Sequence, residues 1–417
     1  MKRALLTLTA LLSLTTASTS WAGMVDTYGI GARAAAMGGA VSASPSPSFA
    51  PYYNPAGLSK AEGTTVSAGV MLTKPDVTID DYKVGNSAPV NFEDDTAPLV
   101  VPHFSVVVPV NDAITFGVAA YVPWGMEVEW DKNTIGANNS YKSKYLRKVV
   151  TPALSYKVNS KLSFGAGISL GQSETGASFK HFGMANTPFE ADLKDDFNTS
   201  WNAGVLFAPT ERLSLGLTYR SRTQADFEGD LKIAGNTATT VTLDYDHPEQ
   251  VQGGIAYRFG AAKNILVEAD ATWTNWSINK SQHEVFSPAL PTPGGILNDK
   301  TIPREWEDTI KAGLGIEWEL NPTVTIRGGY LWDPTPVPDN SLDFIWPDGD
   351  KHIFSIGTGL TFGKFTVDIA ASYANIPGHR TIEGESGALN PSYGGQQVSL
   401  LADGEIFNFG VTTTYRF

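Results

Sequence analysis

The chain has 417 residues, with 43 acidic and 30 basic side chains for a formal net charge of −13, 41 glycines and no cysteine. An acidic chain is a poor nucleic-acid ligand, because phosphate binding requires a basic face. The absence of cysteine excludes disulfides and thiolate metal sites. The six histidines are scattered without zinc-ligand spacing, so we expect neither a metal nor a cofactor.

Residues 1–22 have the features of a secretory signal peptide. Lys2 and Arg3 form a basic start, residues 4–14 form an apolar run, and Ser20-Trp21-Ala22 offers small residues to a signal peptidase. The apolar run is too short to cross a bilayer of about 30 Å as a helix. We predict cleavage after Ala22 and export of the mature chain.

The segment after the signal peptide is unlike the rest of the chain. Residues 29–59 are rich in glycine and alanine and contain four prolines, so they cannot form a regular strand. Five large apolar side chains in it need a buried environment: Met37, Phe49, Tyr52, Tyr53 and Leu58. If the following strands close into a barrel, such a segment fits inside. We interpret residues 23–62 as a plug, called the hatch below, and residues 63–417 as the barrel.

From Gly63 onward, apolar and polar residues alternate with a period of two, which is typical of strands with two different faces. The last strand is the clearest, because its phenylalanine, valine and tyrosine residues face one side and its asparagine, glycine and threonine residues the other. We predict fourteen strands: 63–74, 97–109, 112–130, 143–157, 161–181, 190–208, 212–231, 237–258, 263–279, 305–319, 322–332, 351–362, 364–376 and 402–417.

The connections alternate in length. Tight turns follow the even-numbered strands, whereas most odd-numbered strands precede longer polar loops: 75–96, 280–304, 333–350 and 377–401. This alternation is typical of bacterial outer-membrane barrels, which have short periplasmic turns, and only helices or closed barrels pair every backbone group in lipid. The sequence predicts an all-β protein, a transmembrane antiparallel β-barrel of about 14 strands. Its lumen is too wide for its own side chains to fill, which favours an internal hatch.

Several segments resemble one family, and the hatch contains the first of them, YYNPAGLS. The others are VPHFSVVVPVNDAITFG (101–117), WNAGVLF (201–207), LTYRSRTQADFEGD (217–230), TWTNWS (272–277), WEDTIKAGLGIEW (306–318) and the stretch 325–350. The chain resembles the outer-membrane long-chain fatty acid transporters, the FadL family, over nearly its whole mature length. Within YYNPAGLS, Asn54, Pro55 and Ala56 resemble the family's hatch motif, and the terminal Tyr415 and Phe417 resemble the signal read by the barrel assembly machinery.

The resemblance implies passive, gated uptake of hydrophobic compounds by a monomer embedded in outer-membrane lipid and lipopolysaccharide. A ligand would meet an apolar groove among extracellular loops, pass to a lumen pocket, and leave through a side opening at a kink in the third strand. Long-chain fatty acids are the expected ligands. Aromatic or alkane hydrocarbons remain an alternative, as do an outer-membrane lipid hydrolase and a purely structural barrel.

The loop around 176–196 carries an apolar cluster among polar residues: Phe179, Phe182, Met184 and Phe189. Exposed apolar clusters often mark binding sites. We predict that these residues form the extracellular groove. The alternative is that they pack the loop onto the barrel rim.

The third strand contains Pro123, Trp124 and Gly125. Proline lacks the donor that a strand ladder needs and glycine relaxes the backbone, so both favour a bulge. The resemblance assigns the lateral opening to this kink. An ordinary bulge at a barrel corner is the alternative.

A fatty acid carries a carboxylate, which an apolar pocket holds best with a cation or a hydroxyl group. Arg33, Arg147 and Lys180 are the candidates, and a solvated or interfacial role is the alternative for each. The pattern G-x-S-x-G at residues 167–171 lies within an alternating strand rather than at a strand-to-helix turn. We therefore predict no catalytic residues and no enzyme.

Overall fold

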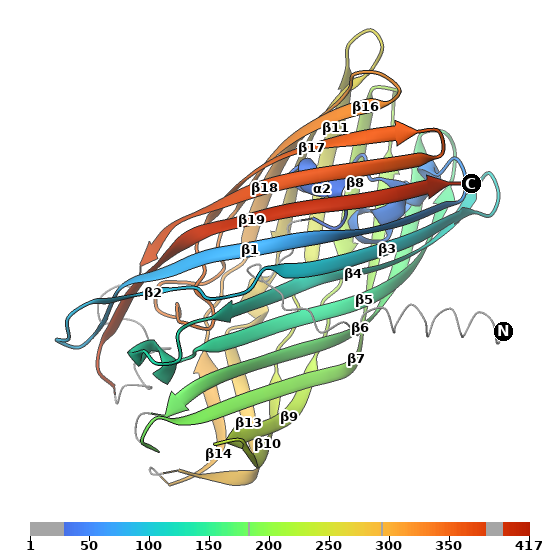
Figure 1. The fold of residues 1–417 in the computed structure, drawn as a ribbon. Coiled ribbons are helices and arrows are strands. Elements are labelled where there is room, and N and C mark those ends of the chain that lie inside the picture. The colour runs from blue at the N-terminus through green and yellow to red at the C-terminus, as the bar shows by residue number, and fades with distance from the viewer. Residues whose placement is uncertain (1–28, 182–183, 293–294, 381–394) are drawn as a thin grey trace.

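The computed structural model describes residues 29–181, 184–292, 295–380 and 395–417. The predicted signal peptide, residues 23–28 of the predicted hatch and Phe182 lie outside this part of the chain. The described residues form a single barrel of long, strongly tilted strands (Figure 1). No helix among them is long and apolar enough to cross a membrane.

The barrel is built from strands with the following bounds: β1 (Thr65–Val84), β2 (Val90–Glu93), β3 (Leu99–Pro109), β4 (Ile114–Glu129), β5 (Lys142–Lys157), β6 (Leu162–His181), β7 (Thr187–Phe207), β8 (Leu213–Arg220), β9 (Asp226–Ile233), β10 (Asn236–Asp244), β11 (Gln250–Phe259), β12 (Ile265–Thr274), β13 (Ser281–Thr292), β14 (Gly295–Pro303), β15 (Thr309–Glu319), β16 (Val324–Asp333), β17 (Lys351–Phe362), β18 (Phe365–Arg380) and β19 (Val398–Arg416). Five consecutive pairs, β2/β3, β8/β9, β10/β11, β12/β13 and β14/β15, each share neighbours and form one interrupted strand. The ring therefore has fourteen strands, as the sequence predicts.

The ring closes between its first and last strands. The register of β1 against β19 runs from Thr65 opposite Arg416 to Val84 opposite Val398, with one bulge. On its other side β1 pairs with β2 and β3. All these ladders are antiparallel, so a closed antiparallel barrel is confirmed, and such closure is what allows strands to span a bilayer.

Strands extend into three of the predicted loops. β1 continues through residues 75–84, β13 and β14 form a hairpin within 280–304, and β18 and β19 extend into 377–401. The sequence expectation was wrong here because polar outward residues alternate with buried inward ones such as Ile79 and Tyr82. Pairing across each hairpin satisfies the backbone beyond the membrane, so these hairpins lengthen the wall at the end opposite the short turns.

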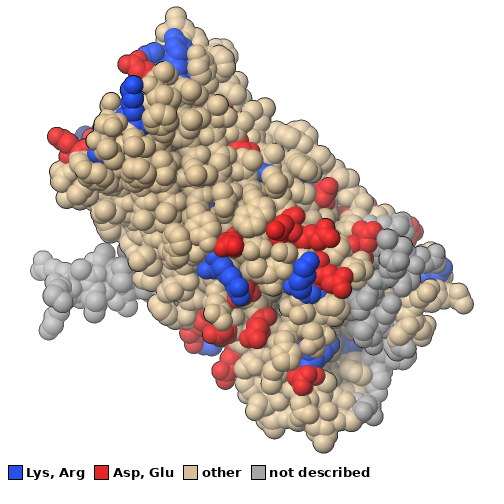
Figure 2. Space-filling model, turned by 180° about the vertical axis from the view of Figure 1, so that it is seen from behind, with Lys and Arg blue, Asp and Glu red and all other residues tan. Residues whose placement is uncertain are grey.

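The outer face of the wall is apolar. On β19, Phe407 and Phe409 are exposed, whereas Ile406, Asn408 and Thr412 face inward and are buried. Neighbouring strands repeat the pattern, with exposed Ile168, Trp201, Leu217, Ile310 and Ile356 among many others. Figure 2 shows a band of mostly uncharged surface between charged groups towards the two ends. This exterior suits a lipid environment.

Residues 29–62 lie inside the ring, near the end where the carboxyl terminus lies (Figure 1, blue). Their short helices are α2 (Ala32–Ala36), η1 (Pro47–Phe49), α3 (Ala50–Tyr53) and η2 (Pro55–Lys60); η3 (Ile135–Asn138) and η5 (Trp276–Ile278) lie in the connections between strands. Prolines stand at the first or second position of η1, α3 and η2, where a missing N–H costs nothing. Helix α2 contacts β16 to β19, and η2 contacts β4 to β7.

Glycines of the wall let the hatch main chain lie directly against it. A Cβ atom on Gly165 would stand 2.2 Å from the Pro55 carbonyl carbon, and one on Gly216 would stand 2.1 Å from the Ser42 carbonyl oxygen. These two glycines belong to β6 and β8, so the close contact is spread around the ring. A larger side chain at either position would push the hatch away from the wall.

Candidate functional site

An apolar, aromatic-rich cluster fills the lumen between the hatch and the long-loop end. We call it the aromatic chamber, and its aromatic members include Trp124, Trp130, Tyr145, Tyr245, Trp276, Trp306, Phe344 and Trp346. Their rings meet mostly edge to face, as between Trp276 and Trp306 with centroids 5.4 Å apart and between Trp306 and Trp346 at 5.1 Å. Apolar surroundings of this kind, drawn from many strands, are what binding sites for hydrophobic ligands provide.

The connection between β16 and β17 enters this chamber. Leu342 and Phe344 in it are fully buried, the indole Nε1 of Trp130 donates to the Phe344 carbonyl over 3.1 Å, and Asp343 pairs with buried Arg304 at 2.7 Å. The expectation of a polar loop at 333–350 was wrong about its location, since this segment folds inward. The apolar residues within it are the sequence signal that could have shown this.

The predicted groove residues gather beside the chamber. Phe189 is buried in the chamber cluster, and Phe179 and Met184 pack against the cluster while partly exposed. The rings of Phe179 and Phe189 stack with centroids 5.1 Å apart. These three residues connect the β6–β7 hairpin with the chamber, which fits either capture of a ligand or packing of the hairpin. Their function as a groove stays a prediction.

The kink occurs where proline and glycine predict it. Against β5, the register passes from Tyr121 opposite Val149 to Trp124 opposite Arg147, so two residues of β4 face one residue of β5. This bulge changes which residues face inward, and Trp124 therefore joins the chamber. Pro123 lies within the bulge, where its missing N–H interrupts no regular ladder.

The ladder between β3 and β4 ends beside this bulge. It runs from Pro109–Thr115 to Phe104–Ala120. Backbone contact is seen again near Glu129, whose N–H donates to Thr96 Oγ1 at 2.8 Å, and at the isolated bridge between Asp94 and Trp130. Val101, Val122 and Leu146 pack together across this part of the wall. The end of the ladder lies where the sequence resemblance places a lateral opening, and apolar side chains fill this part of the wall. The opening itself stays a prediction.

Arg147 lies next to the bulge with its side chain in the lumen. It is 4% exposed, and it lines a cavity that Pro123 and Trp124 also line. Its Nε donates to Asn198 Oδ1 at 2.9 Å and its Nη2 to Ser200 Oγ at 3.2 Å. No carboxylate among the described residues pairs with it. The Asp195 carboxylate lies one hydrogen bond further away, where it accepts from Asn198 Nδ2 at 3.1 Å. A buried cation without a directly paired counter-ion is costly, so this position is suited to an anionic ligand.

A polar network holds Arg147 in place. Asn198, which accepts from Arg147, donates through Nδ2 to Ser173 Oγ at 2.9 Å, and Ser173 Oγ lies 2.8 Å from His247 Nε2. The other ring nitrogen of His247 meets the Tyr145 hydroxyl. Because each member is hydrogen-bonded, the network positions the guanidinium group at the lower edge of the aromatic chamber.

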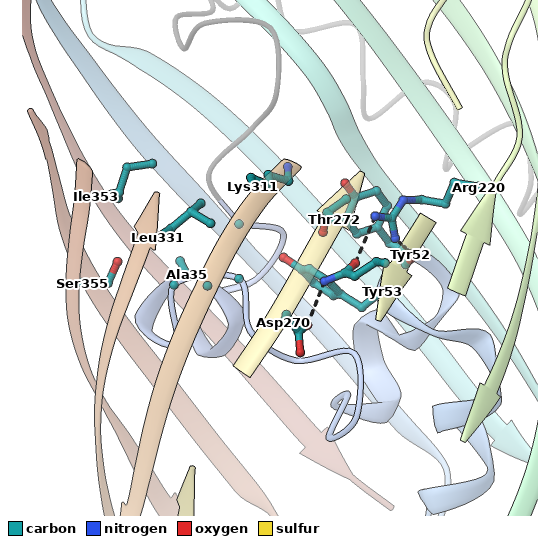
Figure 3. Close-up of a pocket in the computed structure, with 15 residues that line it drawn as sticks. Ala35, Tyr52, Tyr53, Arg220, Asp270, Thr272, Lys311, Leu331, Ile353 and Ser355 are labelled. Carbon is teal, nitrogen blue, oxygen red and sulfur yellow. Dashed lines mark hydrogen bonds between the residues drawn. The ribbon is translucent and has the colours of Figure 1, made fainter. Parts of the chain in front are cut away.

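Sequence reasoning missed Arg220, at the end of β8. Its Nε donates to Gln250 Oε1 at 2.9 Å, and its guanidinium lies 4.7 Å from the centre of the Tyr52 ring. It lines the cavity it shares with Arg147 and a second cavity above the hatch, where Figure 3 shows it beside Tyr52 and Tyr53. Arg220 belongs to the segment 217–230 that carries part of the family resemblance, which is the signal that could have singled it out.

The other two predicted carboxylate ligands lie elsewhere. Arg33 in α2 donates from Nε to Glu317 Oε2 at 2.8 Å and from Nη1 to the Ser44 carbonyl at 2.9 Å, so its charge is already compensated. Lys180 lies near the tip of the β6–β7 hairpin, opposite Pro188. The structure therefore does not bring the three cations together, and Arg33 serves to hold the hatch.

The predicted hatch motif is fully buried against the wall. Asn54 Nδ2 donates to the Ser42 carbonyl at 2.8 Å and to the Val205 carbonyl of β7 at 3.0 Å, while Asn54 Oδ1 accepts from the Ala56 N–H. Pro55 and Ala56 begin η2 and are buried. The motif fastens the hatch to the wall, and its part in gating stays a prediction.

Two wall carboxylates that sequence reasoning also missed bind the hatch main chain. Asp270 Oδ2 accepts from the N–H groups of residues 41–42 at 3.1 and 2.9 Å, and Glu268 Oε1 accepts from those of residues 43–44 at 2.6 and 3.2 Å. Both acids face inward from β12. Two acids at alternate positions of an otherwise apolar strand are a sequence signal for such a lumen site.

The remaining predicted residues lie at the short-turn end. Phe417 is 65% exposed and its ring meets that of Tyr415 edge to face at 4.7 Å. Their recognition by the assembly machinery stays a prediction. No group of metal-binding side chains occurs in the described part of the chain, and residues 167–171 lie inside β6, as expected.

The two cavities that Arg220 lines are small in this conformation. The one that Arg147 lines encloses about 30 Å³ and the one in Figure 3 about 50 Å³. Sites for small-molecule ligands are usually about 300 Å³ or more. The structure is therefore a closed state, and passage of a ligand requires movement of the hatch or of the side chains that fill the lumen.

A closed barrel with an apolar outer face, an N-terminal segment inside its lumen and an aromatic chamber above that segment fits an outer-membrane transporter of hydrophobic compounds. The chain belongs to the family described as outer membrane protein transport protein (OMPP1/FadL/TodX), whose model matches residues 11–417. It is thus an integral protein of the outer membrane and a transport protein rather than an enzyme, and the family resemblance seen in the sequence is confirmed.

Individual relatives agree with this assignment. The chain is 26% identical over 406 residues to the long-chain fatty acid transport protein of Escherichia coli O6:H1 (strain CFT073), with 87% of each chain covered. A solved FadL homologue from Pseudomonas aeruginosa superposes with a TM-score of 0.76 at 21% identity, covering 95% of this chain and 100% of that one. The P. putida toluene transporter TodX gives 0.72 at 19% identity, covering 94% and 99%. The structural similarities show the shared fold.

Proposed function

We propose that this protein takes up long-chain fatty acids by passive, gated diffusion. The ligand is captured near Phe179, Met184 and Phe189, enters the aromatic chamber, and binds with its carboxylate at Arg147. It then leaves sideways through the opening beside the β4 bulge. Residues 23–62 act as the hatch of a barrel formed by 63–417, after removal of the signal peptide 1–22.

The observation that carries the proposal is the buried guanidinium of Arg147. It stands at the edge of an apolar chamber, is oriented by neutral hydrogen-bond acceptors, and pairs with no carboxylate in the described part of the chain. A ligand with an apolar chain and one carboxylate would fill the chamber with its chain and pair with the guanidinium through its carboxylate. A neutral hydrocarbon would fill the chamber but leave the guanidinium unpaired.

Burial of the acyl chain is sufficient as a driving force. Each methylene transferred from water contributes about 0.8 kcal/mol, so a ligand with fifteen of them gains about 12 kcal/mol on full burial. Release towards the membrane then costs little, because lipid is as apolar as the chamber. Val101, Val122 and Leu146 offer the ligand an apolar surface on this path.

The test compares oleate with toluene in cells that lack other uptake routes and express either the wild-type protein or Arg147→Gln. Removal of the charge should lower oleate affinity by about tenfold to a hundredfold, because a hydrogen bond to a charged group contributes about 1.5–3 kcal/mol. Toluene uptake should be unchanged. Arg258→Gln is the matched control, since Arg258 pairs with Glu319 away from the cavity. Equal loss of both ligands, or of neither, would contradict the proposal.

Uptake of aromatic hydrocarbons is the second candidate. The fold is shared with a toluene transporter, and the chamber is lined largely by aromatic rings. The same experiment decides, because a hydrocarbon channel would take up toluene faster than oleate and would not depend on Arg147. Either version of the proposal includes three further points. The barrel assembly machinery inserts the protein by recognising Tyr415 and Phe417, the protein contacts lipopolysaccharide, and it is a monomer.

A further inference from the structure

Arg220 lies between the proposed ligand site and the hatch. It lines the cavity beside the bulge together with Arg147, and it also lines the cavity above the hatch. The groups that accept hydrogen bonds from its guanidinium are all neutral: Gln250 Oε1 at 2.9 Å, Gln252 Oε1 at 3.0 Å and the Tyr52 carbonyl at 3.3 Å. Among the residues that the structure describes, no carboxylate pairs with it.

One set of contacts leads from Arg220 directly to the hatch. Its Nη1 donates to the main-chain carbonyl of Tyr52 in α3, and its guanidinium lies over the ring of the same residue. The Tyr52 ring in turn packs edge to face against Tyr121 of β4, with centroids 5.2 Å apart. Tyr52 is therefore held between Arg220 and the strand that carries the bulge.

A second set reaches the hatch through the wall. Gln252, which accepts from Arg220, donates through Nε2 to Asp270 Oδ2 at 2.9 Å. The same carboxylate oxygen accepts from the N–H groups of residues 41–42 in the hatch. Figure 3 marks the hydrogen bonds that lead from Arg220 to Asp270 as dashed lines. A displacement of Arg220 would therefore disturb the hatch at two separate points.

An anion is a better partner for this guanidinium than the groups that now hold it. A carboxylate adds the attraction between opposite charges to the hydrogen bond and can accept two N–H bonds from one arginine, which amide and main-chain carbonyl oxygens cannot offer together. A carboxylate in the cavity shared with Arg147 would therefore compete with the Tyr52 carbonyl and Gln252 for Arg220. A neutral apolar ligand in the same cavity would not.

We propose that Arg220 senses the charge of the ligand and transmits it to the hatch. A hydrophobic carboxylate that binds between Arg147 and Arg220 draws the second guanidinium away from Tyr52 and Gln252, and the hatch is loosened at α3 and at residues 41–42. A neutral ligand leaves these contacts intact. This inference rests on the proposed function in one respect, namely that a hydrophobic anion reaches the cavity.

The experiment measures amide hydrogen exchange in hatch peptides 38–58 of the purified full-length protein in lipid nanodiscs. Oleate and oleyl alcohol are the probes, since they differ in charge but little in apolar length, and each is used at a concentration that gives equal occupancy. Oleate should accelerate exchange of the hatch amides by about tenfold, which corresponds to loss of hydrogen bonds of ordinary strength. Oleyl alcohol should leave the rate unchanged.

Two variants separate sensing from binding. In Arg220→Gln the amide hydrogens of the hatch should exchange rapidly even without ligand. Oleate should not accelerate their exchange further, although Arg147 still binds oleate. In Gln252→Leu the response should be lost at residues 41–42 and kept around Tyr52. Arg258→Gln, a control at the short-turn end, should respond like the wild type.

The outcomes distinguish this inference from the proposed function. If oleate binds in an Arg147-dependent manner but both probes change hatch exchange equally, or if Arg220→Gln responds as the wild type does, the sensing role is wrong and the proposed function stands. If the wild type binds no oleate at all, both are wrong. Should Arg220→Gln fold poorly, the Gln252→Leu and oleyl alcohol comparisons still decide.

Discussion

At the scale of single residues, a small number of polar side chains seat the hatch. Asn54, Glu268 and Asp270 bind its main chain, and Glu317 Oε2 accepts both from Arg33 and from Arg327 of β16. The contacts of Asn54 with Val205, of Glu268 and Asp270 with residues 41–44 and of Arg33 with Glu317 each join the hatch to a strand far away in sequence. The glycines of the wall allow the close approach. The hatch is thus fixed by these hydrogen bonds together with apolar packing against the wall.

Asn54 offers a sharp test of this view. Asn54→Ala leaves the Ser42 and Val205 carbonyls without their donor, which should cost about 1–3 kcal/mol for buried groups. Asn54→Asp should be as severe, because the carboxylate keeps an acceptor but has no N–H to give. We expect faster proteolysis and hydrogen exchange of the hatch in both variants, with the barrel still folded.

The control for this prediction is Ser59→Ala. The Ser59 hydroxyl makes one hydrogen bond, to the Ala56 carbonyl at 2.7 Å, near the exposed end of η2. Its loss should leave exchange in the rest of the hatch nearly unchanged. If Asn54→Asp behaved as the wild type does, the donor contacts of Asn54 would not be what holds the hatch.

At the scale of the element, β4 combines two functions in one strand. Residues 115–120 of β4 pair with both β3 and β5, whereas beyond the bulge β4 keeps its ladder with β5 and β3 is paired only with β1. A bulge bends a strand and re-aims its side chains. The same backbone irregularity therefore lies where the β3–β4 ladder ends and turns Trp124 into the chamber.

A disulfide across the opening should block transport reversibly. The chain has no cysteine of its own, so Val101→Cys with Val122→Cys places one pair where the two side chains pack across the gap. Oxidation should abolish oleate uptake by tying β3 to β4, and reduction should restore it. Radiolabelled uptake in the oxidised and reduced states is the measurement.

A second pair of cysteines, placed where the β3–β4 ladder is continuous, serves as the control. Val106 and Val118 are direct partners in the β3–β4 ladder, so a disulfide between cysteines at these positions should not affect uptake. Full transport with the Val101–Val122 link closed would show that the ligand leaves by another route.

At the scale of the whole molecule, two segments fill the same lumen one above the other, and we call them the two stoppers. The hatch fills the short-turn end, and the inward-folded segment 334–350 fills the chamber from the other end, with Arg304 paired to Asp343 and Lys351 to Asp348 in buried positions. Buried ion pairs are weak evidence for stability but lose much when one partner is removed. We expect each stopper alone to keep water and small polar solutes out.

This arrangement predicts the effect of deletions on ion conductance in planar bilayers. Removal of residues 29–62 alone, or of 335–349 alone, should leave conductance low, because the other stopper still closes the lumen. Removal of both should give large, steady conductance, as expected for a ring of fourteen strands without internal filling. A large conductance after the hatch deletion alone would contradict the two-stopper arrangement.

Local pattern in the sequence determined the architecture. Period-two alternation and the spacing of turns gave fourteen strands and a closed barrel, since both depend on neighbours in the chain, and Pro123 located the bulge because proline acts on its own backbone. The Asn54 motif and the apolar residues 179–189 were also visible locally, although what they touch was not.

Only the tertiary structure decided which polar groups are free for a ligand. Arg33 and Arg147 are equivalent by type, but Glu317 compensates the first from 284 residues away, whereas the second meets only neutral acceptors. The roles of Arg220 and of the segment 334–350 likewise arise from contacts between distant strands. Charge compensation and burial are sums over all neighbours in space, and a linear pattern contains no information about neighbours that the fold has yet to bring together.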